Sequence, residues 1–315
     1  MTARHVIDQQ RIAWCLGRHS TTIDSLDEEG LNACYTPDGA VAYGFFDGAA
    51  RQLARMLMTS KAGKPRTVHR TSNIWSEVRG DKAWAESYVV ACNTGEESGQ
   101  IAKRLIVGRY LDRLLRADDG WRIAHRTYVL DLNVNRLGDA DESDPFPLST
   151  GVSGSTLAVG PRTMTAEDAT ARVELRALAH SWCRAVDRGD AILLAATGID
   201  ACQMVPSGTS RVVHAVSNLR FAVDGDTASG TSRFTQFVTH DGPDGPRERI
   251  SVGRFEDRFI RRDGAWKFAD RRSMVEQNYE GPSTCLLGAG MYASLKNVGT
   301  RDTNDPVHAF WLGDF

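Results

Sequence analysis

Two stretches, Val68–Asn73 (VHRTSN) and Val213–Asn218 (VHAVSN), decide how this chain is organised. The second follows the first at an offset of 145 residues, and the same offset relates Gly108–Arg113 (GRYLDR) to Gly253–Arg258 (GRFEDR). Similarity at a constant offset is the sequence signature of repeated structural units. The chain is therefore predicted to contain two related units.

Both units end in a matching motif, and a motif near the start of each unit shows where the two differ. Trp121–Arg126 (WRIAHR) matches Trp266–Arg271 (WKFADR) at the offset of 145. Before the His-containing stretch, however, Asp24 pairs with Asp187 at an offset of 163. The second unit therefore lacks 18 residues between its Asp and its His, and the missing piece corresponds to part of residues 35–65.

Length and composition exclude several function classes. At about 150 residues per domain, 315 residues suggest two domains, and a hydrophobic fraction of 41% is ordinary for a globular protein. The net charge of −2 gives no electrostatic reason to expect nucleic acid as a partner. The longest apolar runs are far shorter than the roughly 20 residues of a membrane span, so no membrane partner is expected.

Missing cofactor motifs and the spacing of the cysteines exclude further classes of site. The chain has no P-loop, dinucleotide-binding, nucleophile-elbow or HExxH pattern, so neither a cofactor nor a metal is expected. The start of the chain has no long apolar segment, so a secretory signal is not expected either. The cysteines form no C-x-x-C pair and are interpreted as buried thiols of a reducing cytoplasm. They are Cys15, Cys34, Cys92, Cys183, Cys202 and Cys285.

Hydrophobic periodicity predicts a helix and then strands in each unit. The helices are expected over residues 5–23 and 166–186, and Thr165 with Asp168 is typical of a capping box. The first unit is expected to add a strand over 40–43 and a helix over 49–58. Four long strands are then expected near 67–79, 82–93, 100–116 and 121–131, and again near 210–223, 227–240, 248–260 and 266–277.

The domains are predicted at residues 1–134 and 165–280, with a linker over 135–164 that is rich in Gly, Ser, Asp and Pro. The tail, residues 281–315, is Gly-rich but ends in the aromatic stretch Phe310–Leu312. These aromatic residues indicate docking onto a surface or over a pocket mouth, or else simple packing on the neighbouring domain.

Together, the order and spacing of these motifs resemble the SnoaL-like branch of the nuclear transport factor 2-like superfamily. The resemblance covers the first unit to about Asp131 and the second from about Met164 to Asn278. It implies an α+β fold with two tandem cone-shaped barrels, each a curved antiparallel sheet wrapped around a long helix. Members of this superfamily catalyse cofactor-independent dehydration, dehydrochlorination, isomerisation and related reactions, whereas others are non-catalytic scaffolds or binding proteins.

Most similar is the pattern of scytalone dehydratase, bile-acid dehydratase and hexachlorocyclohexane dehydrochlorinase. These proteins carry an Asp at the helix end, a His on the next long strand and an Arg on the last strand. In the first unit these positions are Asp24, His69 and Arg126, and in the second they are Asp187, His214 and Arg271. A further polar position five residues before the Asp is His19 in the first unit and Trp182 in the second.

The chemistry of these residue types supports proton transfer. A histidine titrates near neutrality, and a neighbouring carboxylate fixes its tautomer and stabilises the imidazolium that forms. We therefore interpret His69 as the base, Asp24 as its partner, Arg126 as the group that stabilises negative charge, and His19 as the acid. Alternatively, Asp24 simply ends a helix and His69 is a core histidine, although their joint recurrence favours a function.

The favoured function is a cofactor-independent lyase that eliminates water, halide or a small carbon fragment from an apolar cyclic or aromatic substrate bearing a hydroxyl. A double-bond isomerase is the near alternative, and a non-catalytic scaffold is the alternative of a different class. The first unit is expected to hold the main site because it keeps its full length, and a homo-oligomer is expected. Candidate pocket residues are Tyr43, Trp75, Tyr88, Tyr110 and Tyr128, with core packing as the alternative for Tyr110. Because side chains alternate along a strand, only some of them are expected to point inward.

Overall fold

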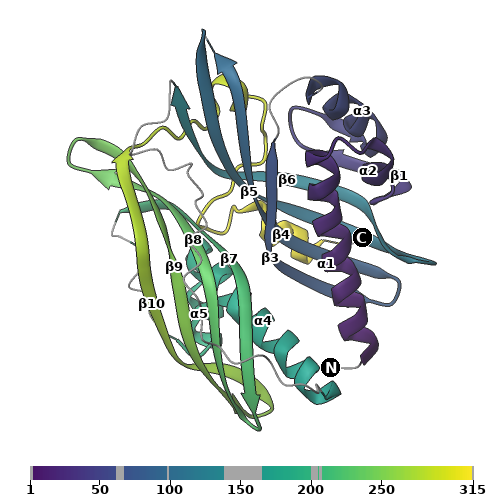
Figure 1. Cartoon of the computed structure of the whole chain (residues 1–315), viewed down its shortest axis with the longest axis vertical. Helices are drawn as coiled ribbons and strands as arrows, with labels where there is room; N and C mark the ends of the chain where they lie inside the picture. The colour runs from purple at the N-terminus through teal and green to yellow at the C-terminus, as the bar shows by residue number, and fades with distance from the viewer. Residues whose placement is uncertain are drawn as a thin grey trace.

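The computed structural model describes residues 3–61, 67–97, 99–137, 165–199, 205 and 208–313. These residues form two α+β units, each a curved sheet with a long helix against one face, followed by a tail that contacts both units (Figure 1). The expected tandem pair of α+β units is therefore confirmed. Most of the expected linker, residues 138–164, lies outside the described residues, and residues 135–137 belong to the last strand of the first unit.

The first unit is built around a six-stranded sheet, here called sheet A. Its strand order is β2-β1-β6-β5-β4-β3, with β1 parallel to β6 and all other neighbours antiparallel. Helix α1 contacts β3 and β6, and α3 contacts β1 and β2. The elements are α1 (Ala3–Asp24), α2 (Glu28–Asn32), β1 (Tyr35–Ala42), β2 (Asp47–Ala49), α3 (Ala50–Lys61), β3 (Val68–Arg79), β4 (Lys82–Glu97), β5 (Gln100–Ala117) and β6 (Gly120–Leu137).

The second unit has a four-stranded antiparallel sheet, here called sheet B, in the order β10-β9-β8-β7. The expected capping box is confirmed at the start of α4, where the side chains and main chains of Thr165 and Asp168 hydrogen-bond reciprocally. Gly189 ends α4 with a φ of 67°, a conformation that favours glycine. The elements are α4 (Ala166–Arg188), α5 (Ala191–Ala196), β7 (Thr209–Asp224), β8 (Thr227–Gly242), β9 (Gly245–Arg262) and β10 (Ala265–Pro282).

Matching contacts locate the segment that the second unit lacks. Asp27 caps α2 in the first unit, and Asp190 caps α5 in the second. The main-chain N–H of Ile123 donates to Cys34, and its counterpart in Phe268 donates to Thr197. The two units therefore correspond up to Cys34 and Thr197, and β1, β2 and α3 have no counterpart among the described residues of the second unit.

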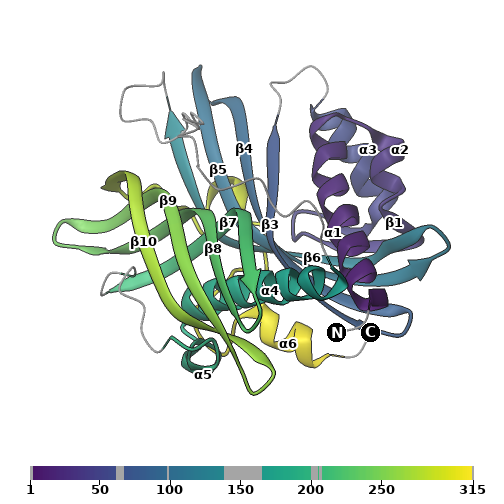
Figure 2. The ribbon, with the colours of Figure 1, turned by 60° about the horizontal axis from the view of Figure 1, so that its bottom comes forward.

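An apolar cluster joins the two sheets. It contains Tyr88, Val90, Leu105, Val107, Leu132 and Val134 of sheet A with Val213, Phe237 and Ile250 of sheet B. Val213 precedes His214, which faces α4 through its bond to Asp187, so Val213 lies on the opposite face of the sheet. The units therefore pack through the sheet faces that their own helices leave uncovered. Helix α4 also contacts β3 of the first unit (Figure 2).

The tail packs on two separate places of the first unit. The short helix η1 (Gly290–Tyr292) inserts Tyr292 into the core cluster that contains Tyr43 and Tyr128. Helix α6 (Pro306–Leu312) places Val307 and Phe310 in a second apolar cluster on the other side of sheet A. The tail thus packs against its neighbouring domain, and part of it contributes to the interior of the first unit.

Several expectations about composition can be compared with the structure. Cys15, Cys34 and Cys183 are buried, Cys92 and Cys285 are half-buried, none of these five is in a disulfide, and Cys202 lies outside the described residues. Within the described part of the chain, no helix is long and apolar enough to cross a membrane.

Glu86 of β4 connects both units and the tail. Its carboxylate accepts hydrogen bonds from Arg188 at the end of α4 and from Trp311 of α6, at 3.2 Å for the latter, and Arg184 lies 3.4 Å away. Burial raises the pKa of Glu86, but the positive charges of Arg188, Arg184 and Arg109 outweigh it and hold the pKa at about 2. Glu86 is therefore ionised in the folded protein at neutral pH.

Asn73 forms a second link between the units. It sits at an irregularity in β3 with a φ of 49°, a left-handed conformation that asparagine tolerates. Its side-chain amide donates to the main-chain oxygen of His214 and accepts from the main-chain nitrogen of Val216, both at 2.7 Å. The side chain thus satisfies main-chain groups on β7, an edge strand of sheet B.

We expect Asn73→Ala to destabilise the protein far more than Asn218→Ala. Both residues have a positive φ, but Asn218 is exposed, whereas Asn73 satisfies two buried main-chain groups. The difference in the free energy of unfolding between the variants should be about 1–3 kcal/mol, measured by urea denaturation. Equal losses in the two variants would contradict the link.

Glu86→Gln should lower the free energy of unfolding by about 3 kcal/mol at pH 7, because it leaves buried arginines without their carboxylate. The pKa of Glu86 is about 2 in the folded protein, against an ordinary value of 4.5. The difference in the free energy of unfolding between variant and wild type should therefore reach its full size above pH 4.5 and become smaller as the pH falls toward 2. Denaturation at several pH values measures this. The exposed Glu77→Gln is the control, with an expected change within about 0.5 kcal/mol.

Candidate active site

Asp24 and His69 form a hydrogen-bonded pair at the end of α1. The Asp24 carboxylate accepts from Nδ1 of His69 at 2.6 Å and from the main-chain nitrogen of His69 at 2.7 Å. Thr67 adds a third hydrogen bond at 3.1 Å. Because the Asp24 carboxylate accepts a hydrogen bond from Nδ1, the neutral imidazole of His69 carries its proton on Nδ1 and its lone pair on Nε2. The two side chains are 24% and 12% exposed, so the pair is within reach of solvent.

Arg126 lies fully buried on the inner face of sheet A. Its Nε and Nη2 donate to the two oxygens of Asp112 at 2.7 and 2.8 Å, and its guanidinium carbon lies 3.9 Å from the ring centre of Tyr110. Burial lowers the pKa of Arg126, but Asp112 and Tyr35 outweigh this and raise the pKa, so the group stays charged. Its Nη1 is buried and has no hydrogen-bond partner among the described residues. A charged donor is thus left inside the first unit.

His19 lies in the same interior, one turn and a half before Asp24 on α1. Its Nε2 is 2.9 Å from the hydroxyl of Tyr35, and its buried Nδ1 has no partner within the described part of the chain. Burial, with the charges of Arg126 and His69, holds the pKa of His19 well below its ordinary value. The imidazole is therefore neutral at pH 7, which suits a hydrogen-bonding role better than the role of a charged acid.

Three of the five candidate pocket tyrosine and tryptophan residues gather around Arg126. Tyr43 stacks on Tyr128 with ring centres 5.5 Å apart, and Tyr110 lies 5.8 Å from Tyr128 and 6.1 Å from Tyr43. Burial raises the pKa of Tyr43, and the nearby charge of Arg126 opposes this shift. The three tyrosine rings therefore surround the guanidinium of Arg126 inside the first unit.

The other two candidates, Trp75 and Tyr88, lie on the opposite face of sheet A. Tyr88 is paired with Arg109, the neighbour of Tyr110, so the alternation of side chains places it on the face toward the second unit. Trp75 is paired with Glu86 on the same face, and Arg184 of α4 lies 6.0 Å from its ring. Their assignment to the interior with Tyr43, Tyr110 and Tyr128 is thus corrected.

The second unit repeats the carboxylate–imidazole pair. Asp187 accepts from Nδ1 of His214 at 2.5 Å and from its main-chain nitrogen at 2.9 Å. Here, however, Nε2 of His214 is 2.9 Å from the side-chain amide of Gln236, which donates to it. Gln236 stands opposite His214 in the strand register, and Ala91 stands at that position opposite His69. An alanine methyl cannot hydrogen-bond, so Nε2 of His69 has no such partner at the paired position of β4.

Aromatic side chains fill the interior of the second unit. Arg271 pairs with Asp257 as Arg126 pairs with Asp112, at 2.8 Å for both hydrogen bonds. However, Trp182 stands in place of His19 and Phe255 in place of Tyr110. The guanidinium carbon of Arg271 lies 4.2–4.4 Å from the ring centres of Trp182, Phe255 and Phe268. Nη1 of Arg271 is buried without a hydrogen-bond partner among the described residues, as is that of Arg126, so the second unit keeps this arginine but surrounds it with apolar rings.

Two cavities lie away from the Asp24–His69 pair. One is between the units and borders Tyr88 and Asp187, and the other, of about 440 Å³, borders Ala222 and Phe259 in sheet B. Among the described residues, no group of three or more His, Cys, Asp or Glu side chains is arranged to hold a metal ion.

Sequence reasoning missed two residues of this arrangement. Tyr35 was included in the segment that the second unit lacks, but no motif indicated that its hydroxyl reaches His19. Gln236 was not singled out, although comparison of the two units at the offset of 145 aligns it with Ala91. Strand register would have shown its significance, because register places it opposite the histidine.

Comparison with known proteins relates the chain to one family. The SnoaL-like domain matches residues 4–127 and 195–272. Similar solved structures include a putative scytalone dehydratase from Novosphingobium aromaticivorans, with 23% identity, a TM-score of 0.39, and coverage of 44% of this chain and 95% of the other. A type 2 hexachlorocyclohexane dehydrochlorinase is 18% identical, with a TM-score of 0.36 and coverage of 44% and 94%.

A protein of unknown function with a cystatin-like fold from Nostoc punctiforme is 21% identical, with a TM-score of 0.34 and coverage of 42% of this chain and 94% of the other. The search among curated proteins found no match. The match to the SnoaL-like domain extends over more than half of the residues. The chain belongs to the family of SnoaL-like domains.

Proposed function

We propose that the protein is a cofactor-independent lyase whose active site lies in the first unit. One observation carries the proposal: His69 is held by Asp24 through Nδ1, and the strand position that blocks Nε2 in the second unit is an alanine in the first. A base needs a free lone pair and a fixed tautomer, and this arrangement provides both. The unpartnered Nη1 of Arg126 adds a fixed positive charge nearby.

The proposed reaction is an elimination. Nε2 of His69 takes a proton from a carbon next to an electron-withdrawing group, and the electron pair of that C–H bond forms a carbon–carbon double bond as the C–O bond of the hydroxyl breaks. The imidazolium returns the proton to the departing hydroxide, so that water leaves. Asp24 stabilises the imidazolium, and Arg126 stabilises the negative charge that develops on the substrate.

The proposed substrate is a small, apolar, cyclic or aromatic molecule with a hydroxyl. Support comes from the aromatic rings of Tyr43, Tyr110 and Tyr128 beside Arg126 and from the exposed apolar side chain of Leu26, two residues after Asp24. Incubation with a panel of such compounds tests this. A new conjugated double bond with loss of water identifies a lyase, an unchanged mass with a moved double bond identifies an isomerase, and binding without conversion identifies a binding protein.

The non-catalytic alternative describes the second unit best. In that unit both ring nitrogens of His214 are hydrogen-bonded, and aromatic rings fill the interior. This arrangement supports a structural role for the second unit. We propose that it serves as the packing partner of the first unit. Assembly into a homo-oligomer stays a prediction.

Ala91→Gln should lower kcat by at least about 10²-fold, as His69→Ala should, because the new amide occupies Nε2 without removing any member of the pair. The matched change Gln236→Ala in the second unit should leave kcat unchanged. Steady-state kinetics on a converted substrate measure the effect, and an unchanged thermal midpoint shows that the variants fold. Full activity of folded Ala91→Gln would contradict the role of His69, and an equal loss in Gln236→Ala would contradict a single site.

Arg126→Lys should lower kcat by about 10²-fold, because lysine keeps the charge but lacks the planar fork that binds Asp112 while presenting Nη1 to the interior. Arg271→Lys is the control in the second unit and should leave kcat unchanged. Circular dichroism and kinetics on both variants separate the chemical effect from misfolding. If the two folded variants behaved alike, Arg126 would have only the structural role of its counterpart.

A further inference from the structure

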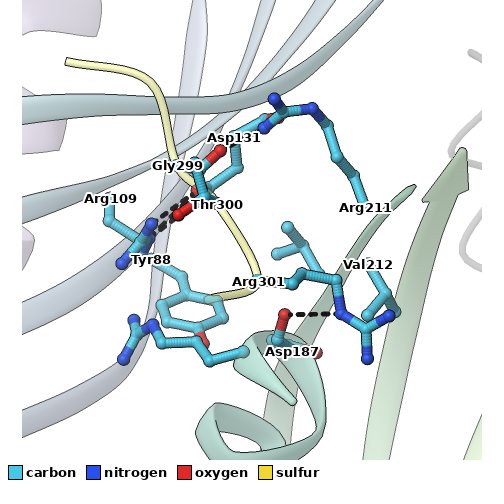
Figure 3. Close-up of a pocket in the computed structure, with 11 residues that line it drawn as sticks. Tyr88, Arg109, Asp131, Asp187, Arg211, Val212, Gly299, Thr300 and Arg301 are labelled. Carbon is cyan, nitrogen blue, oxygen red and sulfur yellow. Dashed lines mark hydrogen bonds and ion pairs between the residues drawn. The ribbon is translucent and has the colours of Figure 1, made fainter. Parts of the chain in front are cut away.

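A cavity of about 20 Å³ lies where β4, the end of α4 and the tail meet, and positive groups dominate its lining (Figure 3). Tyr88 comes from the first unit, Arg188 from the second and Arg301 from the tail. One water molecule needs about 10–15 Å³ of such space, so the cavity has room for one particle of the size of water or a halide. It is separate from the Asp24–His69 pair.

Two guanidinium groups at this cavity have no carboxylate partner. Arg301 donates to the main-chain oxygens of Asp187, Thr209 and Val186 at 3.0–3.3 Å. Arg211 donates to the main-chain oxygens of Asp131 and Gly299. Within the described part of the chain, neither forms an ion pair with a carboxylate within 4 Å.

Buried hydrogen-bond donors also border the cavity without acceptors. Arg188 is 5% exposed and donates to Glu86 through Nη2, but its Nε and Nη1 have no hydrogen-bond partner among the described residues. A carboxylate oxygen of Asp305 lies 3.9 Å from Nε, too far for a hydrogen bond. The hydroxyl of Tyr88, which is 3% exposed, is unpartnered as well. Since burial of unpaired donors is costly, these groups call for an acceptor.

The carboxylates at the cavity are already occupied. Asp131 accepts from the guanidinium of Arg109 at 2.8–3.1 Å, and both oxygens of Asp187 accept from His214. Burial is the main cause that raises the pKa of Tyr88, so its hydroxyl keeps the proton that it can donate. The unpartnered groups are therefore donors, and four arginines stand against two carboxylates in the lining of the cavity.

We infer that this cavity binds a small monovalent inorganic anion of the size of chloride. The anion accepts hydrogen bonds from Arg188 and the Tyr88 hydroxyl and offsets the charges of Arg211 and Arg301. Because these groups come from both units and the tail, the bound anion favours the assembled state over the unfolded one.

A crystal grown in sodium bromide without chloride tests the site directly. The expected result is an anomalous bromine peak in the cavity within hydrogen-bond distance of the Arg188 guanidinium and the Tyr88 hydroxyl. An ordered water without anomalous signal at that position, or an empty cavity, overturns the assignment.

The thermal midpoint gives an independent test in solution. Replacing sodium gluconate, which is too large for the cavity, by sodium chloride at constant ionic strength should raise the midpoint of wild type by about 2 °C or more, with saturation. Tyr88→Phe and Arg188→Lys should lose most of this rise. The matched control Tyr292→Phe removes a hydroxyl that donates to Asn135 away from the cavity and should keep the rise. A rise that is absent in wild type, or equal in Tyr88→Phe and Tyr292→Phe, overturns the inference.

Discussion

The carboxylate of Glu86 holds together three parts of the chain that are far apart in sequence. It is buried on the outer face of β4, and it contacts the end of α4 and the aromatic end of α6. A buried carboxylate is tolerated because Arg188 and Arg184 surround it with positive charge. This requirement fixes where the second unit and the tail can sit on sheet A.

A second buried ionic cluster acts in the same region. Arg109 of β5 binds Asp131 of β6 and Asp305 of the tail through paired hydrogen bonds. Asp305 then caps α6, so the position of that helix depends on the charge of Arg109. The outer face of sheet A is thus specialised for assembly, and its inner face holds the polar groups of the candidate site.

Much of the architecture could be predicted because the chain contains its own comparison. The offset of 145 located every long strand of both units, and the change to 163 located the missing segment after the helix. The pairing of Asp24 with His69 was also expected, and the structure places them in contact. Their catalytic roles stay predictions.

Side-chain direction could not be predicted so well. Trp75 and Tyr88 have the aromatic character of pocket residues, but a shift of one position along a strand moves a side chain to the other face. The bulge at Asn73 decides to which face of the sheet the side chain of Trp75 points, and the sequence does not show where that bulge lies. The contacts of the tail were also beyond prediction, because ion pairs such as that of Arg109 with Asp305 join distant residues without any periodic pattern.

The amide of Gln236 on His214 has a consequence for how such a chain can change over generations. In an assembly of identical subunits, one substitution appears in every copy, so a residue that disables one histidine disables all of them. A chain that carries both copies in a single polypeptide is free of this symmetry. One copy can gain an amide at Nε2 of its histidine while the other keeps an alanine at the equivalent position, as the residues opposite His214 and His69 do.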